Sequence, residues 1–218
     1  ITQFLESKQH PVTAIIGGAK VSSKIPVIKS LLSSVDNLLI GGGMAYTFIK
    51  SKGGHIGESI FEPDMVGACK ELLKEAANKG VLLMLPEDVI AADKFENNAQ
   101  TRTLNASNIE NGWMGLDIGE KTQTIFNNTI NESKTILWNG PLGVFEMESF
   151  SKGTKAIAEA VVETTKKGSF SLVGGGDSVA ALKKFNLVDK VSYVSTGGGA
   201  MLESLEGKAL PGIVALSK

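Results

Sequence analysis

The sequence GGGDS at residues 174–178 carries the residue types that a phosphate group and a divalent cation require. It follows an apolar run at 170–173 and precedes a short stretch whose apolar residues have helical spacing. A buried strand that breaks into glycines and continues as a helix presents backbone N–H groups at a helix N-terminus, which favours phosphate. Asp177 stands where its carboxylate could hold a divalent cation against that phosphate. We therefore predict a nucleotide-phosphate site here, in preference to a flexible glycine turn.

The same layout, an apolar run followed by glycines, recurs along the chain. Glycine-bearing turns follow predicted strands at residues 17–18, 41–43, 140–143, 174–176 and 197–199. The strands are continuous apolar runs, which is typical of a parallel sheet covered on both faces. Their alternation with helical patterns predicts a three-layer, doubly wound α/β fold that is Rossmann-like and has a mostly parallel sheet. Right-handed crossovers bring the glycine turns to one edge of that sheet, where ligands bind in such folds.

The elements that must position these turns follow from hydrophobic spacing. We predict strands at residues 12–16, 38–40, 81–85, 89–92, 135–138, 170–173, 191–194 and 213–216. We predict helices at about 21–32, 43–49, 64–78, 119–129, 150–167, 179–185 and 200–205. Residues 96–113 form a polar surface excursion that could hold short strands. Pro26 is tolerable in the first helix if Ser22 caps it, because the N–H groups of a first turn lack partners in any case.

Composition limits the classes of partner. The 218 residues suit one large domain or two small ones, and 42% hydrophobic residues are enough for a full core. A formal net charge of -1 gives no electrostatic basis for binding nucleic acid or an anionic membrane. A single cysteine, Cys69, excludes an internal disulfide and fits a reducing compartment. We expect a cytoplasmic monomer with no nucleic-acid or membrane partner.

Several familiar nucleotide motifs are absent. The Walker pattern G-x-x-x-x-G-K-[ST] does not occur in the chain. The dinucleotide fingerprint G-x-G-x-x-G fails because Tyr46, Val179 and Leu202 stand where its third glycine would be. Protein-kinase signatures are missing as well, and no His and Cys residues have zinc-ligand spacing.

Two lysines and one glutamate are further candidates. Lys20 and Lys24 are four residues apart, so they face the same way if this stretch forms a helical turn. Independent surface lysines are the commoner alternative, but the position after a strand and two glycines favours a pair that binds phosphates. Glu146 could accept hydrogen bonds from a ribose diol, although taken alone a surface glutamate is the better explanation. Arg102 is the only arginine, whereas recognition of a small phosphorylated acid normally uses several.

Five motifs in the same order make the chain resemble phosphoglycerate kinase. They are GGAKVSSKI at 17–25, GGGMA at 41–45, WNGPLGVFE at 138–146, GGGDS at 174–178 and STGGGA at 195–200. The resemblance runs from about residue 12 to residue 217 and concerns the C-terminal, nucleotide-binding half of that family. It implies that residues 1–10 are the end of the interdomain helix and that 11–218 are the nucleotide-binding domain. It also implies that the N-terminal half is missing, in keeping with the single arginine.

The resemblance implies a reaction and its ligands. A phosphoryl group passes between 1,3-bisphosphoglycerate and MgADP, giving 3-phosphoglycerate and ATP. In the reverse direction the attacking group is a carboxylate that is already deprotonated, so no general base is needed. Catalysis then consists of positioning and charge stabilisation by lysines, Mg²⁺ and glycine-rich helix N-termini. ADP or ATP and Mg²⁺ bind this half, and 3-phosphoglycerate binds the missing N-terminal domain.

The resemblance also implies roles for single residues. Lys20, Gly176 and Gly199 are the expected catalytic contacts to the moving phosphoryl group, and Asp177 is the expected magnesium ligand. Glu146 is expected to hold the ribose, and the glycines at 42, 43 and 115 are expected to line the adenine slot. The expected nucleotide-binding residues are Gly18, Ala19, Lys24, Gly42, Gly43, Gly115, Asn139, Pro141, Gly143, Val144, Glu146, Gly174, Gly175, Gly176, Asp177 and Ser178.

The chain departs from the family pattern at three positions. Ser23 stands where the family often has Asp, Ser178 where Thr is frequent, and Glu120 where Pro is usual. Three functions stay open: half of an enzyme that is active only with its other half, a module that binds Mg-nucleotide without chemistry, and a nicotinamide dehydrogenase. The last rests on fold analogy alone, and the missing third glycine argues against it.

Overall fold

The computed structural model describes residues 9–195, whose centre is a parallel sheet of six strands. In spatial order the strands are β11 (Tyr193–Ser195), β10 (Phe170–Gly174), β9 (Thr135–Asn139), β1 (Val12–Ile16), β2 (Asn37–Ile40) and β4 (Leu82–Met84). β1 lies between β2 and β9 and pairs with both in parallel. Along the chain, β1, β2 and β4 form one half of the sheet, and β9, β10 and β11 then extend it from the other side of β1. The predicted doubly wound α/β sheet is confirmed.

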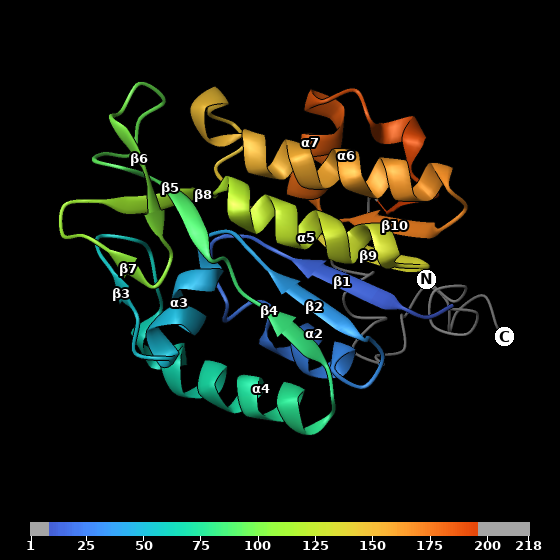
Figure 1. The fold of residues 1–218 in the computed structure, drawn as a ribbon, viewed down its shortest axis with the longest axis horizontal. Helices are drawn as coiled ribbons and strands as arrows, with labels where there is room; N and C mark the ends of the chain where they lie inside the picture. The colour runs from blue at the N-terminus through green and yellow to red at the C-terminus, as the bar shows by residue number, and fades with distance from the viewer. Residues whose placement is uncertain (1–8, 196–218) are drawn as a thin grey trace, which may run out of the picture.

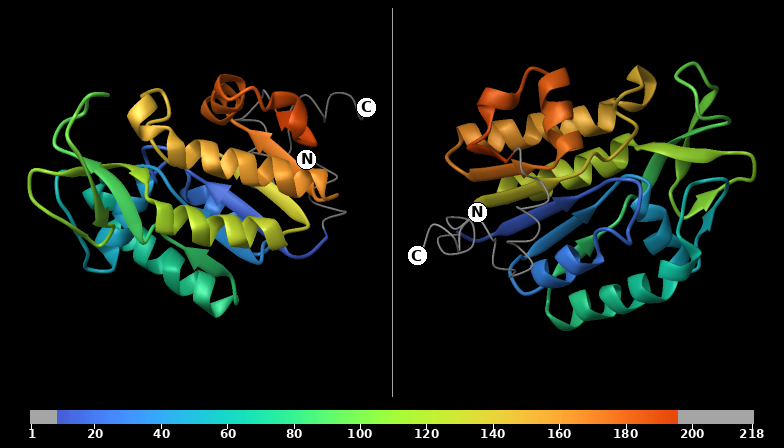
Figure 2. Two further views of the ribbon diagram at one scale, coloured as in Figure 1. Left: turned by 45° about the horizontal axis from the view of Figure 1, so that its top comes forward. Right: turned by 180° about the vertical axis from the view of Figure 1, so that it is seen from behind.

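Helices cover both faces of this sheet, which gives three layers (Figure 1). One face carries α2 (Ile25–Leu31), α3 (Met44–Ser51) and α4 (Val66–Asn78). The other carries α5 (Glu120–Glu132), α6 (Lys152–Lys166) and α7 (Gly176–Lys184). Both views in Figure 2 keep these two groups on opposite sides of the strands. Three short 3-10 turns, η1 (Pro63–Met65), η2 (Glu148–Phe150) and η3 (Val188–Lys190), complete the helical elements of the described chain.

Alternate residues of the central strands pack into the two helical layers. Ala14 and Ile16 belong to the core beneath α2, α3 and α4, whereas Ile15 belongs to the core beneath α5 and α6. Leu137 and Trp138 of β9 divide in the same way. Because both faces are buried, every residue of β1 is inaccessible to solvent, and the sequence shows a continuous apolar run.

A second, smaller assembly adjoins the edge of the sheet at which its strands end (Figure 1). It contains an antiparallel sheet of β6 (Thr101–Asn105), β5 (Asp88–Ala92) and β8 (Met114–Ile118), and a parallel pair of β3 (His55–Ile56) and β7 (Asn108–Ile109). The expected strand at 89–92 is thus present, but outside the central sheet. The surface excursion at 96–113 does contain short strands, as predicted.

Pro26 does lie in the first turn of a helix, but the cap considered for that helix is not present. Ser22 does not cap α2, which begins at Ile25 with Lys24 in the N-cap position and no side-chain cap. The Ser22 backbone N–H and hydroxyl instead donate to the Glu62 carboxylate at 2.9 and 2.6 Å. Pro26 occupies the first turn of the helix, where a missing N–H costs nothing.

Several predicted elements lie outside the described residues. These are the start of the expected interdomain helix at 1–8, the glycine turn at 197–199, the helix at 200–205 and the strand at 213–216. Within residues 9–195, no helix is both long and apolar enough to cross a membrane.

Candidate functional site

Three glycine turns meet at the carboxyl ends of β1, β2 and β9. Backbone hydrogen bonds join them directly: the Gly18 N–H donates to the Pro141 carbonyl at 3.0 Å, and the Gly42 N–H donates to the Leu142 carbonyl at 3.1 Å. The Met44 N–H, at the start of α3, donates to the Gly18 carbonyl at 3.0 Å. The prediction that the turns at 17–18, 41–43 and 140–143 share one edge of the sheet is therefore confirmed.

Gly42 shows why glycine is needed where these turns meet. Its φ of 67° lies in the left-handed region that side chains disfavour. A Cβ atom there would lie 2.7 Å from the Gly18 carbonyl oxygen and 2.9 Å from the Pro141 carbonyl oxygen. Backbone atoms cannot swing aside as a flexible side chain can, so the close approach of the three loops depends on the missing Cβ.

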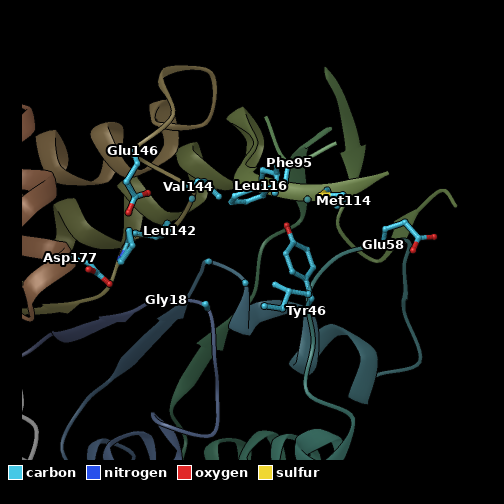
Figure 3. Close-up of a pocket in the computed structure, with 17 residues that line it drawn as sticks. Gly18, Tyr46, Glu58, Phe95, Met114, Leu116, Leu142, Val144, Glu146 and Asp177 are labelled. Atoms are coloured by element: carbon cyan, nitrogen blue, oxygen red, sulfur yellow. The ribbon is translucent and has the colours of Figure 1, made fainter. Parts of the chain in front are cut away.

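A cavity of about 400 Å³ opens where these loops face the small antiparallel sheet (Figure 3). β8 supplies one wall through Gly115, and the loop after β9 supplies another. Many of the residues predicted from the sequence line this cavity. They are Gly18, Ala19, Gly42, Gly43, Gly115, Pro141, Gly143, Val144, Glu146 and Asp177.

The two ends of the cavity differ in chemistry. Glu146 and Asp177 lie together at one end, and Tyr46, Met114 and Phe95 lie toward the other (Figure 3). The sequence reasoning did not identify the cavity-lining residues Tyr46, Glu58, Ile60, Phe95, Met114, Leu116 and Leu142. Met114 and Leu116 are the sequence neighbours of the predicted Gly115, so their position in the sequence could have identified them as lining residues. Nothing in the sequence distinguished Tyr46 from the apolar residues that form the core face of α3.

Several of the remaining predicted residues are joined by hydrogen bonds to one another or to the loop after β9. The Lys24 ammonium donates to the Asn139 side-chain oxygen, and the Asn139 amide donates to the Gly174 carbonyl at 2.7 Å. The Gly140 N–H donates to the Ser178 hydroxyl at 2.6 Å. Ser178 is fully buried, so its hydroxyl holds the loop after β9 and does not face the cavity.

The start of α7 is built from the glycines of the GGGDS motif. Gly174 ends β10, and Gly175 forms the N-cap with a φ of 96°. Gly176 and Asp177 are the first helical residues, and both are exposed. The N–H groups of a first helical turn have no partner inside the helix. This turn therefore offers donors and partial positive charge next to the Asp177 carboxylate.

The two predicted lysines differ in environment. Lys24 is half-buried, and this burial lowers the pKa of its ammonium group, while the Asp177 carboxylate nearby acts in the opposite direction. Lys20 is exposed and precedes the turn at 21–24, so the two lysines do not share one helical face. Neither lysine lines the cavity directly. Gly199, the other predicted catalytic residue, lies outside the described residues.

Asp117 is a buried carboxyl group that sequence reasoning did not single out. It is 2% exposed and accepts hydrogen bonds from the Gly153 N–H at 2.7 Å and the Ile118 N–H at 2.9 Å. Desolvation by burial raises its pKa to about 7, although these two hydrogen bonds lower it. A Cβ at Gly143 would lie 2.1 Å from its carboxylate oxygen. Asp117 thus supports the cavity wall from behind.

The donor set at the cavity suits a magnesium ion that arrives with phosphates. Among the residues that the structure describes, no three His, Cys, Asp or Glu side chains converge to hold a metal ion alone. Mg²⁺ commonly binds through one or two carboxylates together with substrate phosphates and water. The exposed Asp177 carboxylate beside the start of α7 fits that arrangement.

The fold is that of a doubly wound α/β protein, and its cavity lies where the order of the strands reverses, the usual place for a ligand in such folds. The sequence model of the family described as phosphoglycerate kinase matches residues 1–208. The chain therefore belongs to the phosphoglycerate kinase family.

Individual relatives agree with this assignment. Phosphoglycerate kinases from Porphyromonas gingivalis and Trichodesmium erythraeum are 55% and 52% identical over 99% and 97% of this chain. The solved structure of phosphoglycerate kinase from Coxiella burnetii covers 99% of the chain with a TM-score of 0.95 and 45% identity. That from Pyrococcus horikoshii has a TM-score of 0.83 and 27% identity over 99% of the chain. The chain covers only 52%, 53%, 55% and 54% of these four proteins, about half of their length.

Proposed function

We propose that residues 11–218 are the nucleotide-binding domain of a phosphoglycerate kinase and that this domain binds ADP or ATP with Mg²⁺. The observation that carries this proposal is the cavity at the strand ends, which bears Glu146 and Asp177 at one end and the largely apolar side chains of Tyr46, Met114 and Phe95, with Glu58 beyond them, toward the other. A nucleotide is divided in the same way, into a flat base, a sugar diol and charged phosphates. Ligands of doubly wound sheets bind at this edge.

Each part of the nucleotide has a proposed neighbourhood. The base lies beside Gly42, Gly43 and Gly115, which line the cavity. The missing side chains let protein segments pack closely there: a Cβ at Gly115 would lie 1.8 Å from the Tyr46 hydroxyl oxygen. The Glu146 carboxylate accepts hydrogen bonds from the ribose hydroxyls. The other proposed contacts to the ribose and phosphates come from Gly18, Ala19, Lys24, Asn139, Pro141, Gly143, Val144, Gly174, Gly175, Gly176 and the backbone of Ser178.

The phosphate end uses charge and helix polarity. The N–H groups at the start of α7 and the Lys24 ammonium face the phosphates, and Asp177 holds the Mg²⁺ that the nucleotide brings. The bound Mg²⁺ would neutralise part of the phosphate charge. Because Lys24 already donates to Asn139, its position is set before a nucleotide binds.

The complete protein is proposed to transfer a phosphoryl group between 1,3-bisphosphoglycerate and MgADP, giving 3-phosphoglycerate and ATP. Lys20, Gly176 and Gly199 are the proposed contacts to the moving group. 3-Phosphoglycerate would bind an N-terminal domain to which residues 1–10 lead as the end of a connecting helix. Residues 1–218 therefore bind nucleotide without turnover on their own, in a cytoplasmic monomer.

Calorimetric titration of the chain with MgADP tests the nucleotide site. We expect one saturable site per chain, and we expect Lys24→Ala to weaken binding by about tenfold or more, because a charge-assisted contact is lost. Lys29→Ala is the matched control, since Lys29 is an exposed lysine in the last turn of α2. Absence of saturable binding to the unmodified chain would refute the proposal. Unchanged affinity in Lys24→Ala would remove only the role of that lysine.

A complementation assay separates half of an enzyme from a pure binding module. The chain would be mixed with a separately produced N-terminal half, and ATP formation from ADP and 1,3-bisphosphoglycerate would be followed. We expect turnover from the mixture and none from either half. MgADP binding without turnover under any reconstitution would favour the binding module.

A further inference from the structure

Lys184 makes an unusual contact at the far end of α7. Its ammonium group donates to the Phe145 carbonyl at 2.6 Å and to the Glu146 carbonyl at 3.2 Å. These carbonyls belong to the loop after β9, which is 38 to 39 residues earlier in the chain. A lysine in the last turn of a helix often serves only the helix dipole. In this helix it also binds two carbonyl groups of another segment.

The loop that Lys184 binds carries Glu146, whose side chain lines the cavity. Glu146 lines the cavity at the same end as Asp177 (Figure 3). Phe145, whose carbonyl accepts the shorter bond, is buried. The Val144 N–H donates to the Leu116 carbonyl at 2.9 Å, which ties the loop to β8. Of these contacts, the one from the charged Lys184 ammonium group is made to the backbone of Glu146 itself.

Both ends of α7 are therefore connected to the carboxylate end of the cavity, through Asp177 at its start and through the Lys184 contact to the Glu146 loop at its end. Gly176 and Asp177 begin the helix at the proposed phosphate end, and Lys184 ends it at the Glu146 loop. The helix is nine residues long, which corresponds to roughly 13 Å at 1.5 Å per residue.

We propose that Lys184 is a positioning residue that holds Glu146 in place for the ribose. This inference rests on the proposed nucleotide site. Lys184 does not touch the nucleotide, and it acts only through the backbone carbonyls of Phe145 and Glu146. The distinguishing consequence is a loss of selectivity for the ribose diol, and not merely a loss of affinity.

Calorimetry with two nucleotides tests this role in the full chain. The dissociation constants of MgADP and Mg-2′,3′-dideoxy-ADP would be measured for the unmodified chain, Lys184→Met and Lys183→Met. Methionine keeps the apolar stem and removes the charge. Lys183 is the control because it is an exposed lysine in the same helical turn. Lys184→Gln would serve as a second replacement, with thermal unfolding checking that each variant is folded.

We expect the unmodified chain and Lys183→Met to prefer ADP over its dideoxy analogue by about tenfold, as for the loss of a hydrogen-bonded diol. In Lys184→Met and Lys184→Gln this preference should shrink to about twofold, with most of the change in ADP affinity. An unchanged preference in both variants would overturn the inference, as would equal weakening of both nucleotides. No ADP binding by the unmodified chain would instead refute the nucleotide site on which the inference rests.

Discussion

Glycine residues at this site serve two different purposes. Gly176 belongs to an exposed helix start that can face a ligand, as the sequence pattern suggested. Gly17 and Gly42 instead allow backbones to touch: a Cβ at Gly17 would lie 2.1 Å from the Pro141 carbonyl oxygen. Sequence reasoning assigned Gly42 and Gly176 alike to ligand binding and named Gly17 only as part of a glycine turn. A glycine that contacts another loop looks the same in a sequence as one that contacts a phosphate.

Substitution at Gly42 separates close packing from backbone strain. Gly42→Ala should reduce the free energy of unfolding by about 1–3 kcal/mol more than Gly80→Ala does, because its new methyl group overlaps backbone atoms of two other loops. Gly80 is the matched control: its φ of 72° is similar, but no atom lies within 4 Å of its Cβ position. Urea unfolding of both variants measures the difference. Equal losses would mean that strain alone requires glycine at residue 42.

Asp117 should give the chain a distinctive dependence of stability on pH. Burial raises its pKa in the folded state from 3.8 to about 7. Between these pH values the folded carboxyl keeps its proton while the unfolded one releases it. Its stabilising contribution is therefore complete below about pH 4, falls as the pH rises to about 7, and then stays constant.

The comparison with Asp117→Asn isolates this effect from other carboxyl groups. Between about pH 4.5 and 7.5, the free energy of unfolding of the unmodified chain should fall relative to that of the variant. The relative change should be a few kcal/mol at most, since one pKa unit corresponds to about 1.4 kcal/mol. Urea unfolding at several pH values measures it. A relative stability that rises with pH would show that the carboxyl is ionised in the folded chain.

At the scale of elements, α7 is both a scaffold and part of the site. Its Ser178 hydroxyl accepts a hydrogen bond from the Gly140 N–H. Its Lys184 ammonium group donates to two carbonyls of the loop that carries Glu146. The helix itself was predictable from apolar spacing, as were its glycine start and Asp177. The contact partners were not, because hydrogen bonds between segments 38 residues apart leave no local pattern.

Ser178→Ala tests how strongly α7 fixes the loop after β9. The change leaves the buried Gly140 N–H without its acceptor, which should lower the free energy of unfolding by about 1–3 kcal/mol. The control is Ser23→Ala, whose exposed hydroxyl donates to the Lys20 carbonyl at 3.0 Å and whose loss should cost less than about 0.5 kcal/mol. Chemical denaturation compares the two. A cost for Ser178→Ala no larger than the control would mean that the loop keeps its position without this bond.

For the whole molecule, the order of the strands creates the site. Continuous apolar runs such as 12–16 and 135–138 predicted buried parallel strands, and both are present as β1 and β9. Their direct pairing in the sheet was not predictable from periodicity, because it joins residues more than a hundred positions apart. Periodicity also could not place 89–92 in a separate antiparallel sheet. That sheet contributes Met114, Gly115 and Leu116 to the cavity.

Residue-resolved NMR during titration with MgADP tests most directly whether this cavity is the nucleotide site. In amide spectra of the full chain, the largest shifts should occur at Gly18, Gly42, Gly115, Gly143 and Asp177. Residues around the separate hollow formed by Lys52, Leu85 and Asn105 should stay unchanged. Shifts centred on that hollow, or no saturable shifts at all, would contradict the assignment of nucleotide binding to the ends of β1, β2 and β9.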